Sequence, residues 1–492
     1  MQASLEQLRG TVSSYHKGAD LSSLEQAFEL AVKAHEGQRR LSGEPYVNHP
    51  IRTAQFLADM HLQLPIVIAG LLHDVPEDTD VTLDQIRLQF GNDVADIVQG
   101  VTKIGKVKYR GVERYVENVR KFFIAMAEDT RSLIVKFADR IDNLRTLDAQ
   151  PSKKQYRIAL ESLEIFAPAA NRLGMGEIKG IIEDLAFRYT EPKEYAWVKS
   201  LIEQRYEKKQ EYINRVMDVA TQELARTTVP LIRIEGRLKN MYSLYKKLMK
   251  YDRDITKIYD LIAVRIIVPD VASCYSALGS LHHLWKPLKG RIKDYIAQPK
   301  PNGYQSLHTT VFAIGGEIVE FQIRTNQMHE DAEYGIAAHW HYDETGKKSA
   351  IPERHKRWIE EMAQIHREVV KGMDDIEKLK LDFFQNRIFV LTPKGDVIDL
   401  PEEATPVDFA FAIHTDIGSK CSGARINGEM SRLDSSLRSG DIVEIIVDKN
   451  RKGPSADWLK FVKTGHASDK IKAYTKKSLT DWITYIIPKT GK

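Results

Sequence analysis

The segment Leu133–Leu144 reads LIVKFADRIDNL, and its apolar residues recur every three or four positions, as at Phe137 and Ile141. This spacing places them on one face of a helix. The same spacing continues in both directions, from Leu21 to about Val198, with very few strand-like alternations. The sequence therefore predicts an all-helical domain over this part of the chain.

The pattern changes after about Leu231, where β-type runs replace the helical spacing. These runs lie at Ile258–Val268, His308–Ile314 and Ile318–Ile323. The last two are joined through Gly315-Gly316, a strong two-residue signal for a hairpin. Strict alternation along the last run separates its polar residues from its apolar ones. We therefore expect a mixed α+β domain here.

A third block follows a charged amphipathic helix that we expect between residues 351 and 381. Short β-type runs lie at Arg387–Leu391, Val397–Leu400 and Ile442–Val447, and proline and glycine residues separate them. This pattern is typical of a small β-rich module.

The length of 492 residues predicts three or four domains, because single cores stop growing beyond roughly 250–300 residues. The 72 basic and 68 acidic side chains leave a net charge of +4, which excludes a polycationic nucleic-acid coat but permits local basic patches. Only Cys274 and Cys421 are present, so a disulfide framework, a four-cysteine zinc site and an iron–sulfur cluster are excluded. No apolar run is long enough for a membrane span, and we expect a soluble, cytoplasmic protein with no membrane partner.

Two imidazoles and two carboxylates in the helical region form a candidate set of divalent-metal ligands: His49, His73, Asp74 and Asp139. Mixed nitrogen and oxygen ligands suit manganese, iron or zinc, and manganese fits where phosphate oxygens share the shell. Glu77 and Asp78 follow closely and could accept a proton from an attacking water, while Arg40 could neutralise a phosphate. Pro76 ends or kinks the helix near Val75, which places these two carboxylates on a turn. An adjacent His-Asp pair is common by itself, so the prediction depends on the whole spaced set.

The helical region also contains three longer motifs: Gly43-Glu44-Pro45-Tyr46 with His49-Pro50, Leu71-Leu72-His73-Asp74 with Glu77-Asp78-Thr79, and KFADRIDNLRTL from Lys136 to Leu147. Together they resemble the HD-type hydrolase domain of the RelA/SpoT homologue family, the enzymes of guanosine tetraphosphate and pentaphosphate metabolism. The resemblance implies three roles: Mn²⁺ held by His49, His73, Asp74 and Asp139, an attacking water served by Glu77 and Asp78, and the nucleotide contacted by Arg40 and Asn143. Asp142 stands where the family usually has His, and Pro76 where it usually has an aliphatic residue.

No GxxxxGK[ST] loop occurs, so a nucleoside triphosphate would need another cradle. Lys239, Ser243 and Lys247 are four residues apart, and a helix would align them as a cationic stripe. The structural alternative is a solvated helix face. Asp260 and Glu320 lie in two predicted strands, and carboxylates brought together across a sheet can hold Mg²⁺ on polyphosphate oxygens.

The motifs of this region follow one another as RIEGRLKNMYSLYKKL, IYDLIAVRIIV, RIKDYIAQPKPNGYQSLHTTV and VEFQIRT. They resemble the synthetase domain of the same family, which implies transfer of the β,γ-pyrophosphate of ATP to the ribose 3′-oxygen of GDP or GTP. The resemblance places Asp260 and Glu320 at Mg²⁺, with Glu320 as the base, and Tyr304 on the guanine ring. Arg291, Ile292, Lys293 and Asp294 match the RxKD form of bifunctional members. The other nucleotide-binding residues that it implies are Arg237, Lys239, Ser243, Lys247, Arg265, Arg291, Lys293, Lys300, Asn302, His308 and Gln322.

The third block resembles the TGS domain, which implies a ribosome and the acceptor end of uncharged tRNA as partners, with His414 as the tRNA-binding candidate. From Lys449 onward, eleven Lys or Arg residues face three Asp residues, and aromatic residues such as Trp458 and Phe461 are interleaved. This mixture suits RNA contact, although a solvated helical pair with inward-packed aromatics explains it as well. His329, His339 and His341 lack HExxH spacing, and we expect them to be structural.

We therefore expect a bifunctional (p)ppGpp synthetase and hydrolase of the stringent response, in a form without the family's C-terminal zinc-finger-like and ACT modules. The expected domains are the HD-type hydrolase with its connector at 1–198, the synthetase at 199–345, a helical linker at 346–384, TGS at 385–448 and the start of a basic helical domain at 449–492. A mainly hydrolytic enzyme and a ribosome- or tRNA-binding regulator with vestigial sites are the alternatives. The preference for GDP or GTP, the balance of the two activities and the oligomeric state stay open.

Overall fold

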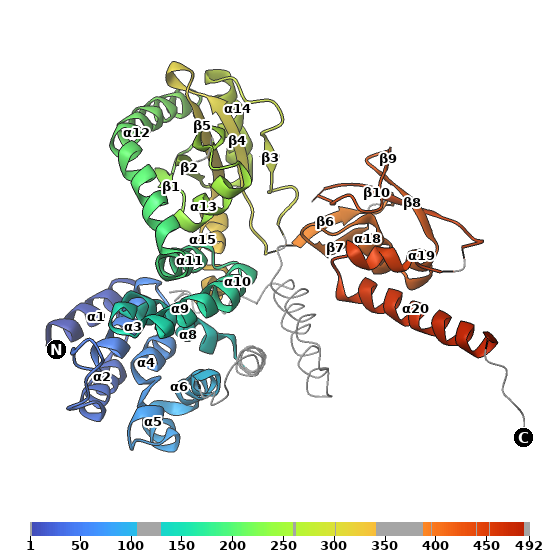
Figure 1. Cartoon of the computed structure of the whole chain (residues 1–492). Helices are drawn as coiled ribbons and strands as arrows, with labels where there is room; N and C mark the ends of the chain where they lie inside the picture. The colour runs from blue at the N-terminus through green and yellow to red at the C-terminus, as the bar shows by residue number, and fades with distance from the viewer. Residues whose placement is uncertain are drawn as a thin grey trace, which may run out of the picture. The chain divides into compact units, whose positions relative to one another are not determined.

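The computed structural model describes residues 2–105, 129–258, 262–300, 302–340, 387–394, 396–438, 440–451 and 453–486 (Figure 1). The chain divides into two compact units, Met1–Gly372 and Met373–Lys492. Asp260 and the helical linker predicted at 346–384 lie outside the described residues. Within the described residues, no helix is both long and apolar enough to cross a membrane.

The first half of unit 1 is helical, as predicted. Its apolar stripe is the core, since Leu133, Phe137, Ile141 and Leu144 are all at most 1% exposed. The helices are α1 (Gln2–Tyr15), α2 (Ser22–Ala34), α3 (Asn48–Asp59), α4 (Leu64–Leu72), α5 (Val75–Asp78), α6 (Leu83–Gly105), α8 (Thr130–Arg145), α9 (Ser152–Glu161), α10 (Ala167–Arg172), α11 (Gly176–Thr190) and α12 (Pro192–Arg226).

The helix is broken near Pro76, between α4 and α5. Helix α4 ends at Leu72, and Pro76 stands in the first turn of the four-residue helix α5, where its missing N–H does no harm. His73 and Asp74 lie in the break, and Glu77 lies in the short turn that follows. The predicted interruption near Val75 is confirmed.

The second half of unit 1 is built on a five-stranded sheet in the order β1-β2-β5-β4-β3. Strands β2 and β5 run parallel, while the other neighbours are antiparallel, and β4 and β5 form the predicted hairpin. Helices α12 and α14 pack against the sheet. The elements are β1 (Arg233–Leu238), α13 (Met241–Lys250), β2 (Ile262–Val268), α14 (Val271–Leu284), β3 (Lys293–Asp294), β4 (Leu307–Phe312), β5 (Ile318–Thr325) and α15 (Asn326–Tyr334).

The boundary expected at 198/199 falls inside α12, which is continuous across it. The helical half and the sheet half meet where α11 packs on α13 and α15, and we call this contact the seam. There the backbone N–H of Ile336 donates to the carbonyl of Leu173 over 2.9 Å. Gly335 has a φ of 55°, and a side chain on it would collide with that same carbonyl. The seam therefore requires glycine at this position.

Unit 2 carries the predicted β-rich module around α18, which begins with a capping box between Thr405 and Asp408. Its sheets have the orders β10-β8-β9 and β6-β7. The short strands β8 and β9 were not predicted. The elements are β6 (Arg387–Leu391), β7 (Val397–Pro401), α18 (Pro406–Ile413), α19 (Thr415–Ser419), β8 (Cys421–Ile426), β9 (Glu429–Ser431), β10 (Val443–Val447) and α20 (Gly465–Ile486).

The basic segment after Lys449 shares the core of this module, contrary to the separate domain that we expected. Trp458 and Ile471 pack in one apolar cluster with Phe411 of α18. The carboxylate of Asp408 also accepts the backbone N–H of Thr464 over 2.8 Å. The prediction was wrong because it considered only the local excess of positive charge. Helix α20 also has an apolar stripe, and this stripe packs against α18.

Candidate active sites

The imidazole–carboxylate site, formed by His49, His73, Asp74 and Asp139, is assembled by three separate helical segments. His49 stands in the first turn of α3, His73 and Asp74 in the break after α4, and Asp139 in the middle of α8. Nε2 of His49 lies 3.1 Å from Oδ1 of Asp139 and 3.5 Å from Oδ2 of Asp74. Nε2 of His73 lies 3.3 Å from Oδ1 of Asp74. The structure thus brings all four predicted ligands together.

Both imidazoles are oriented by a bond on the ring nitrogen that faces away from the centre. Nδ1 of His73 donates to the carbonyl of Gly70 over 2.9 Å, and Nδ1 of His49 lies 2.7 Å from Oδ2 of Asp142. Nε2 of His73 is buried and has no hydrogen-bond partner. A buried, unpartnered lone pair beside carboxylates is the arrangement that a divalent cation satisfies, so the residues fit a metal. Among the described residues, the histidine and acidic side chains that converge in this way are His49, His73 and Asp74.

The carboxylates of this site are held in their ionised form. Burial raises the pKa of Asp139, but the Lys136 ammonium, 2.7 Å away, and the two imidazoles bring it well below its usual range. Burial likewise opposes ionisation of Asp74, and the neighbouring His73 and His49 lower its pKa. For His49, burial lowers the pKa while bonds to Asp139 and Asp142 raise it to about 9. Protons and a cation therefore compete for this imidazole.

Tyr46 connects the predicted metal ligand Asp74 to the candidate base Asp78. Its hydroxyl lies 3.0 Å from Oδ2 of Asp74 and 2.7 Å from Oδ2 of Asp78. Asp78 is exposed, and Glu77 precedes it in α5. Both predicted bases are therefore carried on the short turn that follows the His-Asp pair.

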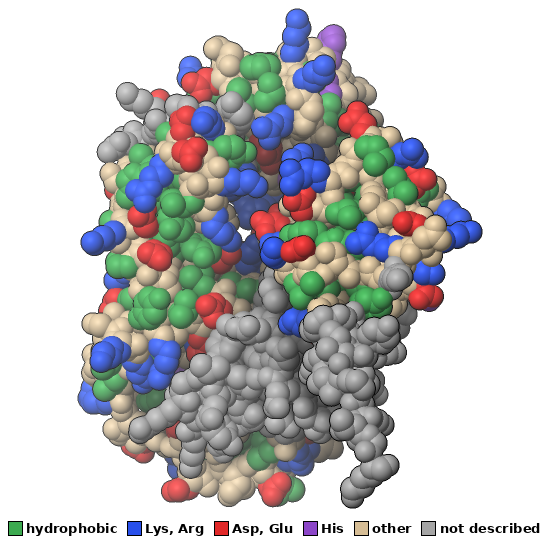
Figure 2. All heavy atoms as spheres, turned by 45° about the vertical axis from the view of Figure 1, so that its right-hand side comes forward, with side chains coloured by type: hydrophobic (Ala, Val, Ile, Leu, Met, Phe, Trp, Pro, Cys, Tyr) green, Lys and Arg blue, Asp and Glu red, His purple; other side chains and the backbone are tan. Residues whose placement is uncertain are grey.

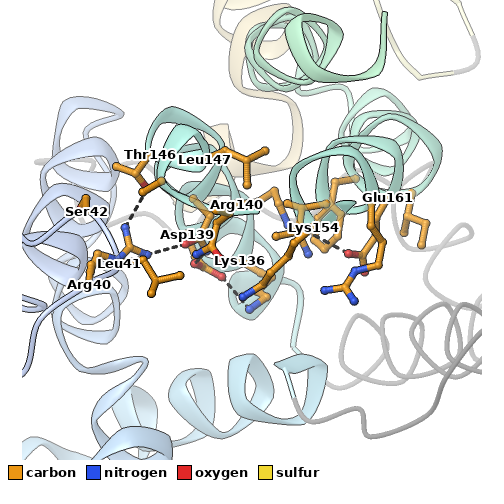
Figure 3. A pocket seen from close by; sticks show the side chains of 17 residues that line it. Arg40, Leu41, Ser42, Lys136, Asp139, Arg140, Thr146, Leu147, Lys154 and Glu161 are labelled. Atoms are coloured by element: carbon orange, nitrogen blue, oxygen red, sulfur yellow. Dashed lines mark hydrogen bonds and ion pairs between the residues drawn. The ribbon is translucent and has the colours of Figure 1, made fainter. Parts of the chain in front are cut away.

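A cavity of about 280 Å³, the Arg40 cavity, opens beside Asp139 (Figure 3). Arg40 reaches across it to α8, where its guanidinium donates to Oδ1 of Asn143 over 2.6 Å and to the Thr146 hydroxyl over 3.0 Å. Asn143 in turn donates to Asp139. Arg40 and Asn143, the two residues predicted to contact a nucleotide, thus bond to each other, and Asn143 also bonds to the predicted metal ligand Asp139.

Sequence reasoning missed basic residues on the far wall of the Arg40 cavity. Lys154 and Arg157 of α9 line it, three residues apart, and Lys136 lines it from α8. The exposed basic spacing in α9 could have indicated the first two, since residues three apart share a helix face. Lys136 is part of the quoted motif, but the structure is needed to show that its ammonium pairs with Asp139 and lines the cavity.

The second site, the cationic cavity, has a volume of about 410 Å³. Among its described lining residues, seven Lys or Arg side chains face a single carboxylate, that of Glu320. Tyr251 and Lys257 also line it and were not predicted. The predicted residues that do line it are Arg237, Lys239, Ser243, Lys247, Arg291, Lys293, Lys300, His308, Glu320 and Gln322.

The polar residues of β4 and β5 form a hydrogen-bonded row. Oε1 of Glu320 lies 3.1 Å from Nδ1 of His308 and accepts the Gln322 amide over 3.0 Å, as the predicted alternation allows. Nε2 of His308 lies 2.8 Å from the Tyr304 hydroxyl. Burial lowers the pKa of His308 although Glu320 opposes this. A neutral His308 therefore links Tyr304 to the carboxylate.

Lys300 is crowded by other cations. The residue is exposed as a whole, but its ammonium lies 4.6 Å from the ring centre of Tyr295 and 5.0 Å from that of Tyr304. Burial of this group and the nearby Lys293 and Lys179 lower its pKa to about 8. Repulsion between these lysines therefore disfavours the charged form of Lys300, and a bound anion would favour it.

Two predictions about the cationic cavity need correction. Lys239 lies before α13, because Asn240 has an extended backbone (φ −54°, ψ 138°), so the stripe begins at Ser243. Arg265 is 5% exposed and pairs with Glu235 and Glu333 instead of lining the cavity.

Two further predicted residues stand beside the cavity without lining it. The Asn302 amide donates to the carbonyl of Asn171 over 3.2 Å, and Tyr304 points its hydroxyl to His308. Asp260, the second predicted Mg²⁺ ligand, lies outside the described residues.

Family models match three parts of the chain, in the predicted order. An HD domain matches residues 27–176, a region found in RelA/SpoT proteins matches 236–347, and a TGS domain matches 388–447. The chain is 41% identical to the bifunctional (p)ppGpp synthase/hydrolase SpoT of Escherichia coli K12, over 97% of this chain and 68% of that protein. The chain belongs to the RelA/SpoT family.

Other RelA/SpoT relatives carry the names of both reactions. A GTP pyrophosphokinase of Myxococcus xanthus is 44% identical over 95% of this chain and 62% of its own length. A guanosine-3′,5′-bis(diphosphate) 3′-pyrophosphohydrolase of Aquifex aeolicus is 43% identical over 96% of this chain and 67% of its own length. The chain spans 56 to 62% of the length of the first four curated relatives that it matches.

In the TGS part of this RelA/SpoT chain, His414 follows α18 with a side chain that is 65% exposed. Its Nδ1 accepts the backbone N–H of Asp416 over 3.2 Å and so caps α19. His329, in the synthetase region, bonds to Arg233 and Arg324, and burial together with Arg324 lowers its pKa to about 4. His329 is therefore structural, as predicted, while His341 lies outside the described residues.

Proposed function

We propose that the chain hydrolyses the 3′-pyrophosphate of (p)ppGpp at the imidazole–carboxylate site and makes (p)ppGpp from ATP and GDP or GTP in the cationic cavity. The observation that carries the proposal is the presence in one compact unit of a cluster of imidazoles and carboxylates and of a separate cavity lined mostly by predicted basic residues. Relatives named for each reaction, and for both, support the same pairing.

For hydrolysis, the nucleotide would lie in the Arg40 cavity. Arg40 and Asn143 present hydrogen-bond donors to it, and Lys154 and Arg157 present positive charge to a 5′-diphosphate. Mn²⁺ held by His49, His73, Asp74 and Asp139 would neutralise phosphate charge and favour ionisation of the attacking water. Asp78 or Glu77 takes the proton of that water. The water oxygen bonds to the phosphorus next to the ribose, the bond from that phosphorus to the 3′-oxygen breaks, and the same carboxyl returns the proton to the 3′-oxygen, which gives GDP or GTP and pyrophosphate.

For synthesis, the cationic cavity would hold the polyphosphate of ATP against its basic wall. Glu320, placed by β5 and oriented by His308 and Gln322, accepts the proton of the ribose 3′-hydroxyl. The hydroxyl oxygen then bonds to the β-phosphorus of ATP, and AMP leaves. Glu320, together with the predicted ligand Asp260, would hold Mg²⁺, which would neutralise charge on the polyphosphate.

A ribosome- or tRNA-binding role for the TGS part, and a cytoplasmic location, stay predictions. Basic and acidic side chains are interspersed on the face seen in Figure 2, in keeping with the near balance of 72 basic and 68 acidic residues. RNA binding by unit 2 would thus depend on local geometry and would weaken with salt. Inward-packed Trp458 and Phe461 favour the structural explanation of the interleaved aromatics.

The test uses the purified chain with Mn²⁺ and Mg²⁺. One reaction contains labelled ATP with GDP or GTP, and another contains labelled ppGpp, and chromatography separates the products. Product in both supports bifunctionality. Product in the hydrolysis reaction alone would leave a mainly hydrolytic enzyme, and product in neither, with salt-sensitive RNA binding, would favour the regulator.

A further inference from the structure

Asp142 lies one step behind the imidazole–carboxylate site. It is 2% exposed, and its carboxylate contacts three side chains from outside its own helix. Oδ2 accepts Nδ1 of His49 over 2.7 Å, and Oδ1 accepts Nε of Arg52 over 2.6 Å. Arg40 adds a weaker contact of 3.3 Å to Oδ2. These three donors compensate for the burial of the carboxylate and hold it in one orientation.

Asp139 and Asp142 are three residues apart on α8 and therefore share a face. They meet opposite nitrogens of the same imidazole, since Asp139 lies 3.1 Å from Nε2 of His49 and Asp142 lies 2.7 Å from Nδ1. A proton held on Nδ1 by Asp142 leaves the Nε2 lone pair directed at the other ligands. Asp142 thus selects the tautomer in which His49 can bind a cation.

Arg52 makes the burial of Asp142 tolerable. Its Nε and Nη2 reach the two carboxylate oxygens of Asp142 over 2.6 and 3.1 Å. The same guanidinium is clamped from the other side by Glu44, with two contacts of 2.9 Å. The hydrogen bonds therefore form a row from Glu44, in the loop before α3, through Arg52 of α3 and Asp142 of α8 to His49 of α3. His49 lies at the predicted metal position. Each link is bidentate or buried, so the imidazole has little freedom to turn.

We propose that Asp142, braced by Arg52 and Glu44, is a positioning residue that fixes the tautomer and orientation of His49 for a divalent cation. The inference rests on the proposed metal-dependent hydrolase function. Asp142 contacts neither the metal position nor the nucleotide cavity directly, and it acts through His49 and Arg40. Its effect should therefore be seen first in metal affinity.

The experiment measures Mn²⁺ binding to the full chain through the electron paramagnetic resonance signal of free Mn²⁺. Asp142→Ala should weaken Mn²⁺ affinity by about 10- to 100-fold, the usual cost of losing an outer-shell partner. Asp142→Asn should weaken it less, because an amide oxygen in the Oδ2 position can still accept from His49, whereas the amide nitrogen in the Oδ1 position can no longer accept from Nε of Arg52. Asp59→Asn, at the exposed end of the same helix as His49, is the matched control and should bind like wild type.

Synthesis by the same preparations reports whether each variant is folded. If Asp142→Ala does not fold, the milder Asp142→Asn decides the question. Asp142 variants that make (p)ppGpp and bind Mn²⁺ as tightly as wild type would overturn the role of Asp142 while leaving the metal site intact. A wild-type chain that binds Mn²⁺ no better than His73→Ala would overturn the metal site itself, and the role of Asp142 with it. Added Mn²⁺ should restore hydrolysis by Asp142→Asn, which a purely structural role would not predict.

Discussion

The imidazole–carboxylate site and the cationic cavity differ in how their charges are balanced. In the first, the carboxylates of Asp74 and Asp139 already have imidazole or ammonium partners, and their pKa values are lowered accordingly. In the second, seven basic side chains face one described carboxylate, and the pKa of Lys300 falls to about 8. The helical site thus has nearly balanced charges on its described residues, whereas the described lining of the sheet site carries an excess of basic side chains.

This difference predicts that the two sites fail independently. His73→Ala removes a ligand that has no substitute among its neighbours, so hydrolysis should fall roughly 10³-fold or more. Synthesis should stay within about twofold of wild type, because the cationic cavity shares no described lining residue with the first site. Parallel assays of the two reactions measure both effects. His283→Ala, an exposed histidine in α14, is the control, and loss of both activities in His73→Ala would refute independence.

The converse change tests the carboxylate of the second site. Glu320→Gln keeps the shape of the side chain but removes the base, so synthesis should fall by about 10²- to 10³-fold while hydrolysis continues. Initial rates with saturating ATP and GDP measure the loss. Glu317→Gln, an exposed residue in the turn before the same strand, should leave synthesis unchanged. Unimpaired synthesis by Glu320→Gln would transfer the role of base to another residue.

A smaller effect is expected on the wall of the Arg40 cavity. The double variant Lys154→Ala with Arg157→Ala should raise KM for ppGpp by about tenfold with little change in kcat, since two charge-assisted contacts to phosphate are lost from binding. Steady-state hydrolysis kinetics give the two constants. Lys153→Ala is matched, because this neighbouring exposed lysine does not line the cavity. A fall in kcat without a rise in KM would argue against simple substrate binding.

The pH dependence of ATP binding gives the smallest effect and tests the charge excess itself. A lysine whose pKa is lowered to about 8 loses its charge as the pH rises through that value, and a bound phosphate would restore the proton. ATP affinity should therefore fall a few-fold between about pH 7.5 and 9, with proton uptake on binding. Titration calorimetry in buffers of different ionisation heat measures both. Lys300→Arg should flatten the dependence, and an unchanged slope would mean that another group is responsible.

Much of the fold and of both sites followed from the sequence. Periodic apolar residues such as Phe137 are buried as predicted, and the hairpin through Gly315-Gly316 is present, because these signals depend only on local geometry. The side chains of His49, His73, Asp74 and Asp139 lie close together, and their role as metal ligands stays a prediction. Pro76 ends the helix where steric reasoning placed it.

The rest depended on contacts between segments that are distant in sequence. Arg265 was expected at the nucleotide, but it pairs with Glu333, 68 positions along the chain, a partner that no spacing rule identifies. Lys239 was assigned to a helix that begins only after Asn240, because identical spacing occurs on either side of a helix boundary. The sequence showed Asp142 only as a departure from the family pattern. Its partner Arg52 lies 90 positions away, and only the folded structure shows their contact.

The seam at Gly335 limits how this molecule can be taken apart. The N–H of Ile336 and the carbonyl of Leu173 satisfy each other across it, and no side chain fits between them. A cut through the seam would leave a bare donor on one fragment and a bare acceptor on the other. Recombination that exchanged only one half would have to supply a matching glycine and a matching turn. The helical half and the sheet half of unit 1 are thus easier to inherit together than to exchange separately.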